Sequence, residues 1–186
     1  SIADLLEGLT DTDLLITVIS GGASSLLCLP SDLSCEALGR ITKTLMGQGA
    51  TISEINTFRK HTSKIQGGQF AKMAYPATVV SLIFSDVPGD DIATVASGPT
   101  VLDTTSIADA RAVLKKYNIE ELCKLPECEF VETPKDLEFF QRVYNILFVT
   151  NRRALTAMKN EAERLGYKAE IVSAELQGEA RAIGKS

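Results

Sequence analysis

The apolar positions of this chain fall into two patterns, short continuous runs and stripes at helical spacing. Apolar runs rich in β-branched residues predict buried strands at 14–19 and 79–84, and two further strands are predicted at 145–150 and 168–172. Helical spacing predicts helices at 2–9, 35–46, 52–65, 107–117, 152–165 and 174–184. The strand, helix and strand over 145–172 predict a βαβ unit, which requires parallel strands. We therefore expect one α/β domain over residues 1–186, a three-layer α/β/α sandwich with a Rossmann-like, mostly parallel sheet.

Polar residues before several of these stripes predict where the helices begin. Ser34 suits an N-cap, and Thr51 with Glu54 has the spacing of a capping box. Either Thr105 or Ser106 precedes the helix that begins at 107, and Asn151 precedes the one at 152. These helix starts are predicted from local hydrogen-bonding residues alone.

Composition narrows the class of protein. Apolar residues make up 45% of the 186 residues, which is enough for a sizeable core. The formal net charge of −5 argues against a general nucleic-acid surface, and no apolar run is long enough to span a bilayer. The four cysteines form no Cys-x-x-Cys pair and have one histidine to join them, which argues against a zinc site. Scattered free thiols instead predict a reducing, cytoplasmic location.

The loop after the run at 79–84 carries three carboxylates, Asp86, Asp90 and Asp91, around a Pro-Gly turn. In an open parallel sheet, ligands bind beyond the carboxyl ends of the strands. A carboxylate there is well placed to accept a proton or to hold a hard cation. The segment closes with a turn at 97–100 that adds backbone and hydroxyl donors.

A second loop, Ser20-Gly21-Gly22-Ala23-Ser24-Ser25, follows the run at 14–19. Small residues after a strand allow backbone amides to approach an anion closely. A tight turn that needs glycine for steric reasons explains the pattern equally well. The loop matches neither the dinucleotide-binding fingerprint nor a P-loop.

Basic residues cluster on the helix predicted at 52–65. Lys60 and Lys64 are four residues apart, with His61 beside them and Arg59 at the edge. Spacing alone favours a solvated basic face over a clamp for phosphate or carboxylate groups. His61 is interpreted as an exposed helical histidine and not as a catalytic base.

Several motifs together resemble the glycerate kinases that carry a C-terminal MOFRL domain, some of which are labelled hydroxypyruvate reductases. The resemblance covers nearly the whole chain, in the expected order. It rests on the segments 20–27, 49–61, 63–68, 85–91, 96–100 and 151–155. It implies that this chain is the central portion of a longer kinase, without the N-terminal segment, which supplies a lysine implicated in catalysis, and without the MOFRL domain, which supplies the far wall of the cleft.

With this resemblance, we predict ATP-dependent phosphorylation of glycerate to 2-phosphoglycerate, with ATP and Mg²⁺ as cofactors. Asp86 would orient the attacking hydroxyl or bind Mg²⁺, Asp90 would be a second metal ligand, and Asn151 would contact the nucleotide. The other predicted catalytic residues are Arg59 and Lys60. The predicted substrate- or phosphate-binding residues are Ser20, Gly21, Gly22, Ser24, Lys64, Ser97, Gly98 and Thr100.

Two other functions stay open at this point. A nicotinamide-dependent hydroxypyruvate reductase would need a third spaced glycine that the loop at 20–25 lacks. A non-catalytic binding module is disfavoured by the presence of Asp86 and the basic cluster. The expected partners are glycerate, ATP and a MOFRL domain, with no nucleic acid and no membrane, and the sequence leaves open whether the protein forms a homodimer.

Overall fold

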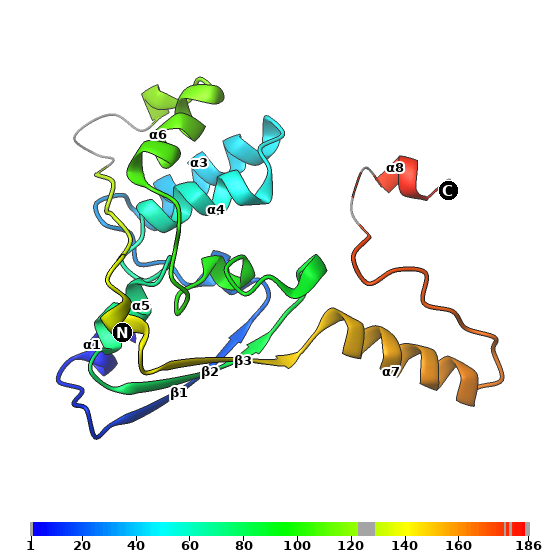
Figure 1. Cartoon of the computed structure of the whole chain (residues 1–186). Helices are drawn as coiled ribbons and strands as arrows, with labels where there is room; N and C mark the ends of the chain where they lie inside the picture. Colours follow the sequence, from blue (N-terminus) through cyan, green and yellow to red (C-terminus); the bar gives the residue numbers. More distant parts are fainter. Residues whose placement is uncertain (1, 123–128, 177, 179, 185–186) are drawn as a thin grey trace.

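A computed structural model describes residues 2–122, 129–176, 178 and 180–184. Among these residues, one sheet contains three strands, β1 (Leu14–Ser20), β2 (Thr78–Phe84) and β3 (Val143–Val149), in the order β1-β2-β3. Both pairings are parallel, with Ile16 opposite Val80 and Val80 opposite Tyr144 (Figure 1). The predicted α/β class with a parallel sheet is confirmed.

Helices connect the strands and cover one face of the sheet. The α-helices are α1 (Ile2–Leu6), α2 (Ala23–Leu26), α3 (Cys35–Gly47), α4 (Ile52–His61), α5 (Gln69–Ala74), α6 (Ile107–Lys116), α7 (Asn151–Arg164) and α8 (Ala180–Ile183). Short 3₁₀ turns occur at Pro88–Asp90, Val95–Ser97, Glu120–Leu122 and Leu137–Phe140. The predicted caps at Ser34, Thr51 and Ser106 all accept backbone hydrogen bonds, and the last two form capping boxes.

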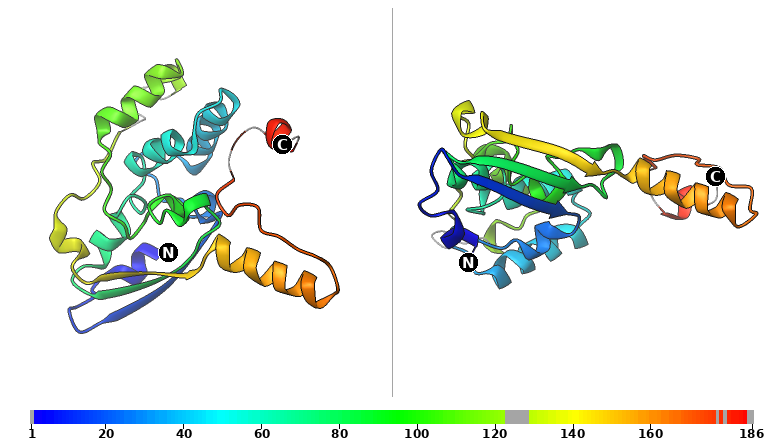
Figure 2. Two further views of the ribbon diagram at one scale, coloured as in Figure 1. Left: turned by 45° about the vertical axis from the view of Figure 1, so that its right-hand side comes forward. Right: turned by 90° about the horizontal axis from the view of Figure 1, so that it is seen from below.

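Two apolar clusters hold the helices in place. Phe58, which is fully buried, lies at the centre of a cluster formed by α3, α4 and α6. A second cluster packs Phe70 and Ala74 of α5 against Val79 of β2. The side chains on the opposite face of the sheet are open to solvent, and Ile16 and Tyr144 are 61% and 57% exposed. The right-hand view of Figure 2 looks onto this face, with the helices behind it.

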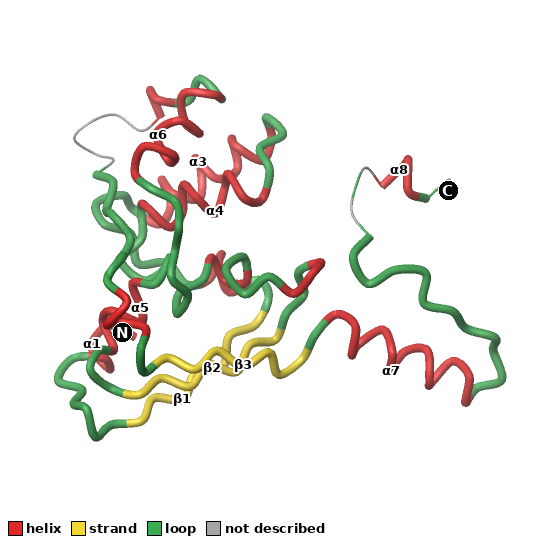
Figure 3. The backbone as a smooth tube through the Cα atoms, viewed as in Figure 1, coloured by secondary structure: helices red, strands yellow, loops and turns green. Residues whose placement is uncertain are grey.

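The end of the chain departs from the prediction. The helix expected at 152–165 is present as α7, but its N-cap is Thr150, whose side chain accepts from the Arg153 amide. Residues 168–172 form no strand, so the predicted βαβ unit is absent. Of the described residues in the last predicted helix, only Ala180–Ile183 are helical (Figure 3). A strand is stable only where it pairs with a neighbour, and Val172 is instead 90% exposed. No helix among the described residues is long and apolar enough to cross a membrane.

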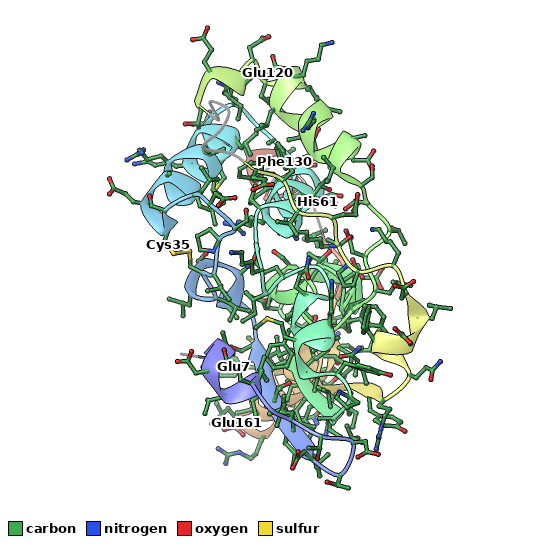
Figure 4. The ribbon with its side chains drawn as sticks, turned by 90° about the vertical axis from the view of Figure 1, so that its left-hand side faces the viewer. Glu7, Cys35, His61, Glu120, Phe130 and Glu161 are labelled. Carbon is green, nitrogen blue, oxygen red and sulfur yellow. A yellow bond between two sulfur atoms is a disulfide. The ribbon has the colours of Figure 1, made fainter. Side chains whose placement is uncertain are left out.

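The expectation of free thiols is wrong for two of the cysteines. Cys28 and Cys35 form a disulfide that joins the loop after α2 to the first residue of α3 (Figure 4). Cys123 and Cys128 lie outside the described residues. The argument for a reducing location assumed free thiols, so it loses its basis. The spacing of the cysteines gave no indication of this pair.

Replacing Cys28 and Cys35 with alanine is expected to lower the free energy of unfolding by about 2 kcal/mol, because the disulfide constrains a short loop in the unfolded chain. Denaturant titration of the oxidised wild type and the double variant measures this difference, and mass spectrometry without reductant detects the bond. Equal midpoints for the two proteins would show that the disulfide does not contribute to stability.

Candidate active site

The predicted site segments meet at one edge of the sheet. Because the strands are parallel, the ends of β1, β2 and β3 at Ser20, Phe84 and Val149 lie side by side. The loop at 20–25 (the glycine loop), the loop at 85–91 (the acidic loop) and α7 follow these three ends directly (Figure 1). This is the edge at which open α/β sheets bind ligands.

Asp86 lies against the backbone of Gly21. A Cβ atom added to Gly21 would overlap the Asp86 carboxylate, so a side chain here would displace Asp86 from its position. The φ angle of Gly22 is +78°, which glycine adopts without strain. The first glycine thus allows the carboxylate to approach closely, and the second suits the backbone conformation. Both loops face the same small volume.

That volume is a cleft of about 250 Å³ between the two loops and α4. The residues that line it are Gly21, Gly22, Ser24, Ile52, Asn56, Asp86, Val87, Pro88, Thr94, Val95 and Ala96. Sequence reasoning missed Asn56, which is 4% exposed and whose Oδ1 accepts a hydrogen bond from Ser97 Oγ at 3.0 Å. Its position one turn before Arg59 was the available signal, because residues three apart share a helix face.

Arg59 extends from α4 into an adjoining cavity of about 260 Å³ that shares Ser24 with the cleft. Its Nη1 donates to Ser24 Oγ at 3.3 Å. Burial lowers the pKa of the guanidinium, and no carboxylate among the described residues forms an ion pair with it. A half-buried cation that contacts only a hydroxyl is poised to bind an anionic ligand.

Lys60 is not brought to this cleft. It is 8% exposed, it does not line the cleft, and its Nζ forms an ion pair with Asp103 at 3.0 Å. Next to it, His61 is fully buried, with Nδ1 3.0 Å from the Val131 carbonyl oxygen and Nε2 3.1 Å from Thr105 Oγ1 (Figure 4). Neither residue is therefore exposed, contrary to the solvated face that the spacing favoured.

The pKa of Asp103 is lower than usual. Burial is the largest single influence and raises the pKa. Hydrogen bonds from Thr105 and Thr133, with the charge and hydrogen bond of Lys60, together lower it by more than burial raises it. Asp103 is therefore a buried anion that binds α4 to the segments around 103 and 133. This cluster supports the fold and lies outside the cleft.

Lys64 is also separated from the basic cluster. Helix α4 ends at His61, and Lys64 follows in the next turn, so it does not share a helical face with Lys60. The side chain of Lys64 is exposed. The prediction of a helix through residue 65 was wrong, because Ser63 closes a turn by accepting the backbone amides of Ile65 and Gln66.

The turn at 97–100 supports the cleft from inside. The Ser97 hydroxyl donates to Asn56, and the Gly98 carbonyl accepts from the Gly68 amide. Thr100 is buried and donates to Asn145 on β3 at 2.6 Å. These three predicted binding residues therefore have partners within the protein. Ser20 lines a separate apolar cavity of about 410 Å³ that also includes Gly21.

Asp90 and Asn151 meet at the start of α7. Asp90 Oδ1 accepts a hydrogen bond from the Asn151 amide at 3.3 Å, and the Asn151 side chain donates to the Ala174 carbonyl. In the part of the chain that the structure describes, no group of three or more His, Cys, Asp or Glu side chains is arranged to hold a metal ion. A magnesium ion bound by one or two carboxylates together with substrate phosphates does not need such a group.

Comparison with known proteins reveals close similarity over the whole chain. Residues 1–127 match the family described as "Domain of unknown function (DUF4147)". A glycerate 2-kinase from Pyrococcus horikoshii is 42% identical over 97% of this chain and 42% of its own length. A D-glycerate 2-kinase from Thermotoga maritima is 38% identical over 99% of this chain and 44% of its own length.

A solved structure supports the same conclusion. The crystal structure of a glycerate kinase from Thermotoga maritima superposes with a TM-score of 0.78 at 37% identity, covering 92% of this chain and 41% of that one. The predicted three-layer α/β/α class is consistent with this likeness. The chain thus spans less than half the length of the relatives it matches.

Proposed function

This chain belongs to the DUF4147 family, and from that premise we propose that it forms part of an enzyme that phosphorylates glycerate with ATP. The product would be 2-phosphoglycerate, in line with the names of the relatives from Pyrococcus and Thermotoga. The observation that carries the proposal is the convergence of Asp86, Gly21 and Arg59 around Ser24, at the carboxyl edge of a parallel sheet.

In this mechanism, the 2-hydroxyl of glycerate enters the cleft beside Asp86. The hydroxyl oxygen attacks the γ-phosphorus of ATP, its proton passes to the Asp86 carboxylate, and the bond from phosphorus to the ADP oxygen breaks. Arg59 binds the substrate carboxylate or a phosphate, and the backbone amides of residues 21–24 add uncharged donors. Such positioning and charge stabilisation account for most of the catalysis in phosphoryl transfer.

Mg²⁺ would accompany the ATP phosphates and neutralise their charge. As the alternative to accepting the proton, Asp86 would hold Mg²⁺ together with Asp90, and Asn151 would contact the nucleotide. Ser97, Gly98 and Thr100 would support the cleft through their hydrogen bonds within the protein, and the exposed Lys64 has no role in this mechanism. The proposal extends to a MOFRL domain as the opposite wall of the cleft. With Cys28 and Cys35 in a disulfide, the cysteines give no support to the predicted cytoplasmic location.

A coupled assay of ADP release across a panel of small hydroxy acids tests the proposed reaction. In an active polypeptide that contains this chain, we expect release with glycerate and ATP, and no oxidation of NADH when hydroxypyruvate is supplied. ADP release that is independent of any hydroxy acid, or oxidation of NADH, would refute the proposal.

The Arg59→Met substitution is expected to raise the KM for glycerate about 10- to 100-fold, because a hydrogen bond to a charged group contributes about 1.5–3 kcal/mol. Steady-state kinetics measures this change. Arg40→Met is the matched control, since Arg40 is exposed on α3 and pairs with Glu36. An unchanged KM in the Arg59 variant would remove Arg59 from substrate binding.

A further inference from the structure

Gln66 is a buried residue that the mechanism does not yet use. It lies in the turn between α4 and α5 and is 2% exposed. Its Nε2 donates to the carbonyl oxygens of Ser24 and Leu27, at 3.2 and 3.3 Å. Its Oε1 is buried and accepts no hydrogen bond from the described residues. The side chain therefore connects the turn at 66 to the glycine loop, 42 residues earlier in the sequence.

The loop that Gln66 contacts has little stability of its own. Helix α2 comprises only Ala23–Leu26, and no side chain caps its start. A single helical turn is not stable in isolation, and the last carbonyl groups of a helix lack donors within the helix. The Gln66 amide supplies donors to two of these carbonyl groups. It fixes the backbone of Ser24, whose hydroxyl accepts the hydrogen bond from Arg59.

The unpaired Oε1 indicates why glutamine is present here. A buried acceptor without a donor is unfavourable, and an apolar side chain of similar shape would avoid that cost. Among the described residues, only the donating end of the amide has hydrogen-bond partners, and both bonds go to the loop of the candidate active site. The stabilising contribution of the Gln66 side chain therefore comes from its hydrogen bonds to that loop.

We propose that Gln66 is a positioning residue that holds the Ser24–Leu27 segment in the conformation that binds the substrate anion. This inference rests on the proposed function for its effect on catalysis, but not for its effect on the loop. The hydrogen-bonded path runs from Gln66 Nε2 to the backbone of Ser24, and from Ser24 Oγ to Arg59. Gln66 itself does not line the cleft or the cavity of Arg59.

Hydrogen–deuterium exchange tests the positioning role directly on the 186-residue chain. In the Gln66→Met variant, which keeps the shape but removes the donors, we expect amides of residues 22–28 to exchange about tenfold faster, as expected for losing one net hydrogen bond. Exchange in β2 should stay unchanged. Gln69→Met is the matched control, because Gln69 is also buried and donates to the Glu132 carbonyl, away from this loop.

A pH series separates a positioning role from a general loss of packing. In Gln66→Glu, the ionised carboxylate faces two carbonyl oxygens and cannot donate, whereas the protonated form regains one donor. Relative to wild type at each pH, exchange of residues 22–28 should slow as the pH falls from about 8 to 5, because burial brings the pKa of a carboxyl into this range. The methionine variant should show no such recovery.

Kinetics then tests the effect on the reaction. In an active polypeptide containing this chain, Gln66→Met should lower kcat/KM for glycerate about tenfold, chiefly through KM, and Gln69→Met should leave it within twofold. Fast exchange with unchanged kinetics would refute the catalytic part of the proposal. Unchanged exchange at 22–28 would refute positioning altogether. If the wild type lacks glycerate turnover, the proposed function fails while the exchange experiment still decides the role of Gln66.

Discussion

The Asp86→Asn substitution is expected to lower the turnover of glycerate about 10²- to 10⁴-fold, because the amide cannot accept the proton of the attacking hydroxyl. The amide is nearly isosteric with the carboxylate, so it still fits against Gly21. The KM for glycerate should change far less than kcat, since Asp86 acts mainly as the proton moves. Steady-state kinetics and a thermal unfolding curve together separate loss of chemistry from loss of fold.

Asp91→Asn is the matched control in the same loop. The Asp91 carboxylate accepts the amide of Ala93 at 3.0 Å and the hydroxyl of Thr94 at 2.7 Å, so it stabilises the turn. We expect nearly normal kcat in this variant, with a small loss of stability. Equal activities of the two variants and the wild type would exclude Asp86 from the reaction.

The Asp103→Asn substitution should have the largest effect on stability, lowering the free energy of unfolding by about 3–5 kcal/mol. The amide keeps the size of the side chain but removes the charge opposite the buried ammonium of Lys60. The substitution also weakens the hydrogen bonds that the Thr105 and Thr133 hydroxyls donate to residue 103, and the bond from Thr133 joins distant segments. Urea titration measures the loss. Asp109→Asn, at an exposed capping box, is expected to have a much smaller effect.

The pH dependence of this effect has a definite sign. Because the folded state lowers the pKa of Asp103, the carboxylate stabilises the fold above its unfolded pKa of about 3.9. That contribution should disappear as the pH falls below 3.9 toward the lower folded value. The difference in stability between the wild type and Asp103→Asn should therefore shrink in this range. A difference that is independent of pH would contradict the role of Asp103 as a buried anion.

Local signals in the sequence predicted much of the fold. The strands β1, β2 and β3 are mostly apolar, and Ser34, Thr51 and Ser106 cap helices through hydrogen bonds three residues away. The meeting of Asp86 with the glycine loop was also predictable, because both follow parallel strands. These features depend on residues close in sequence or on a general rule of sheet topology.

The remaining features depend on contacts between distant segments. Lys60 has a partner 43 residues later in the sequence, and no local pattern indicates that this pair is buried. Gln66 and Asn56 likewise bind groups 38–42 residues away. The run at 168–172 has the composition of a strand but pairs with no neighbour in the described chain. Propensity alone could not decide these cases.

The central claim is that glycerate binds where Gly21, Ser24, Asp86 and Arg59 converge. Titrating glycerate into the isotopically labelled 186-residue chain, and following its backbone amide signals by NMR, tests this most directly. The account predicts saturable shifts confined to residues 21–25, 86–88 and the end of α4 around Arg59. Shifts centred instead on the Lys60–Asp103 cluster, or the absence of any shift at saturating glycerate, would contradict it.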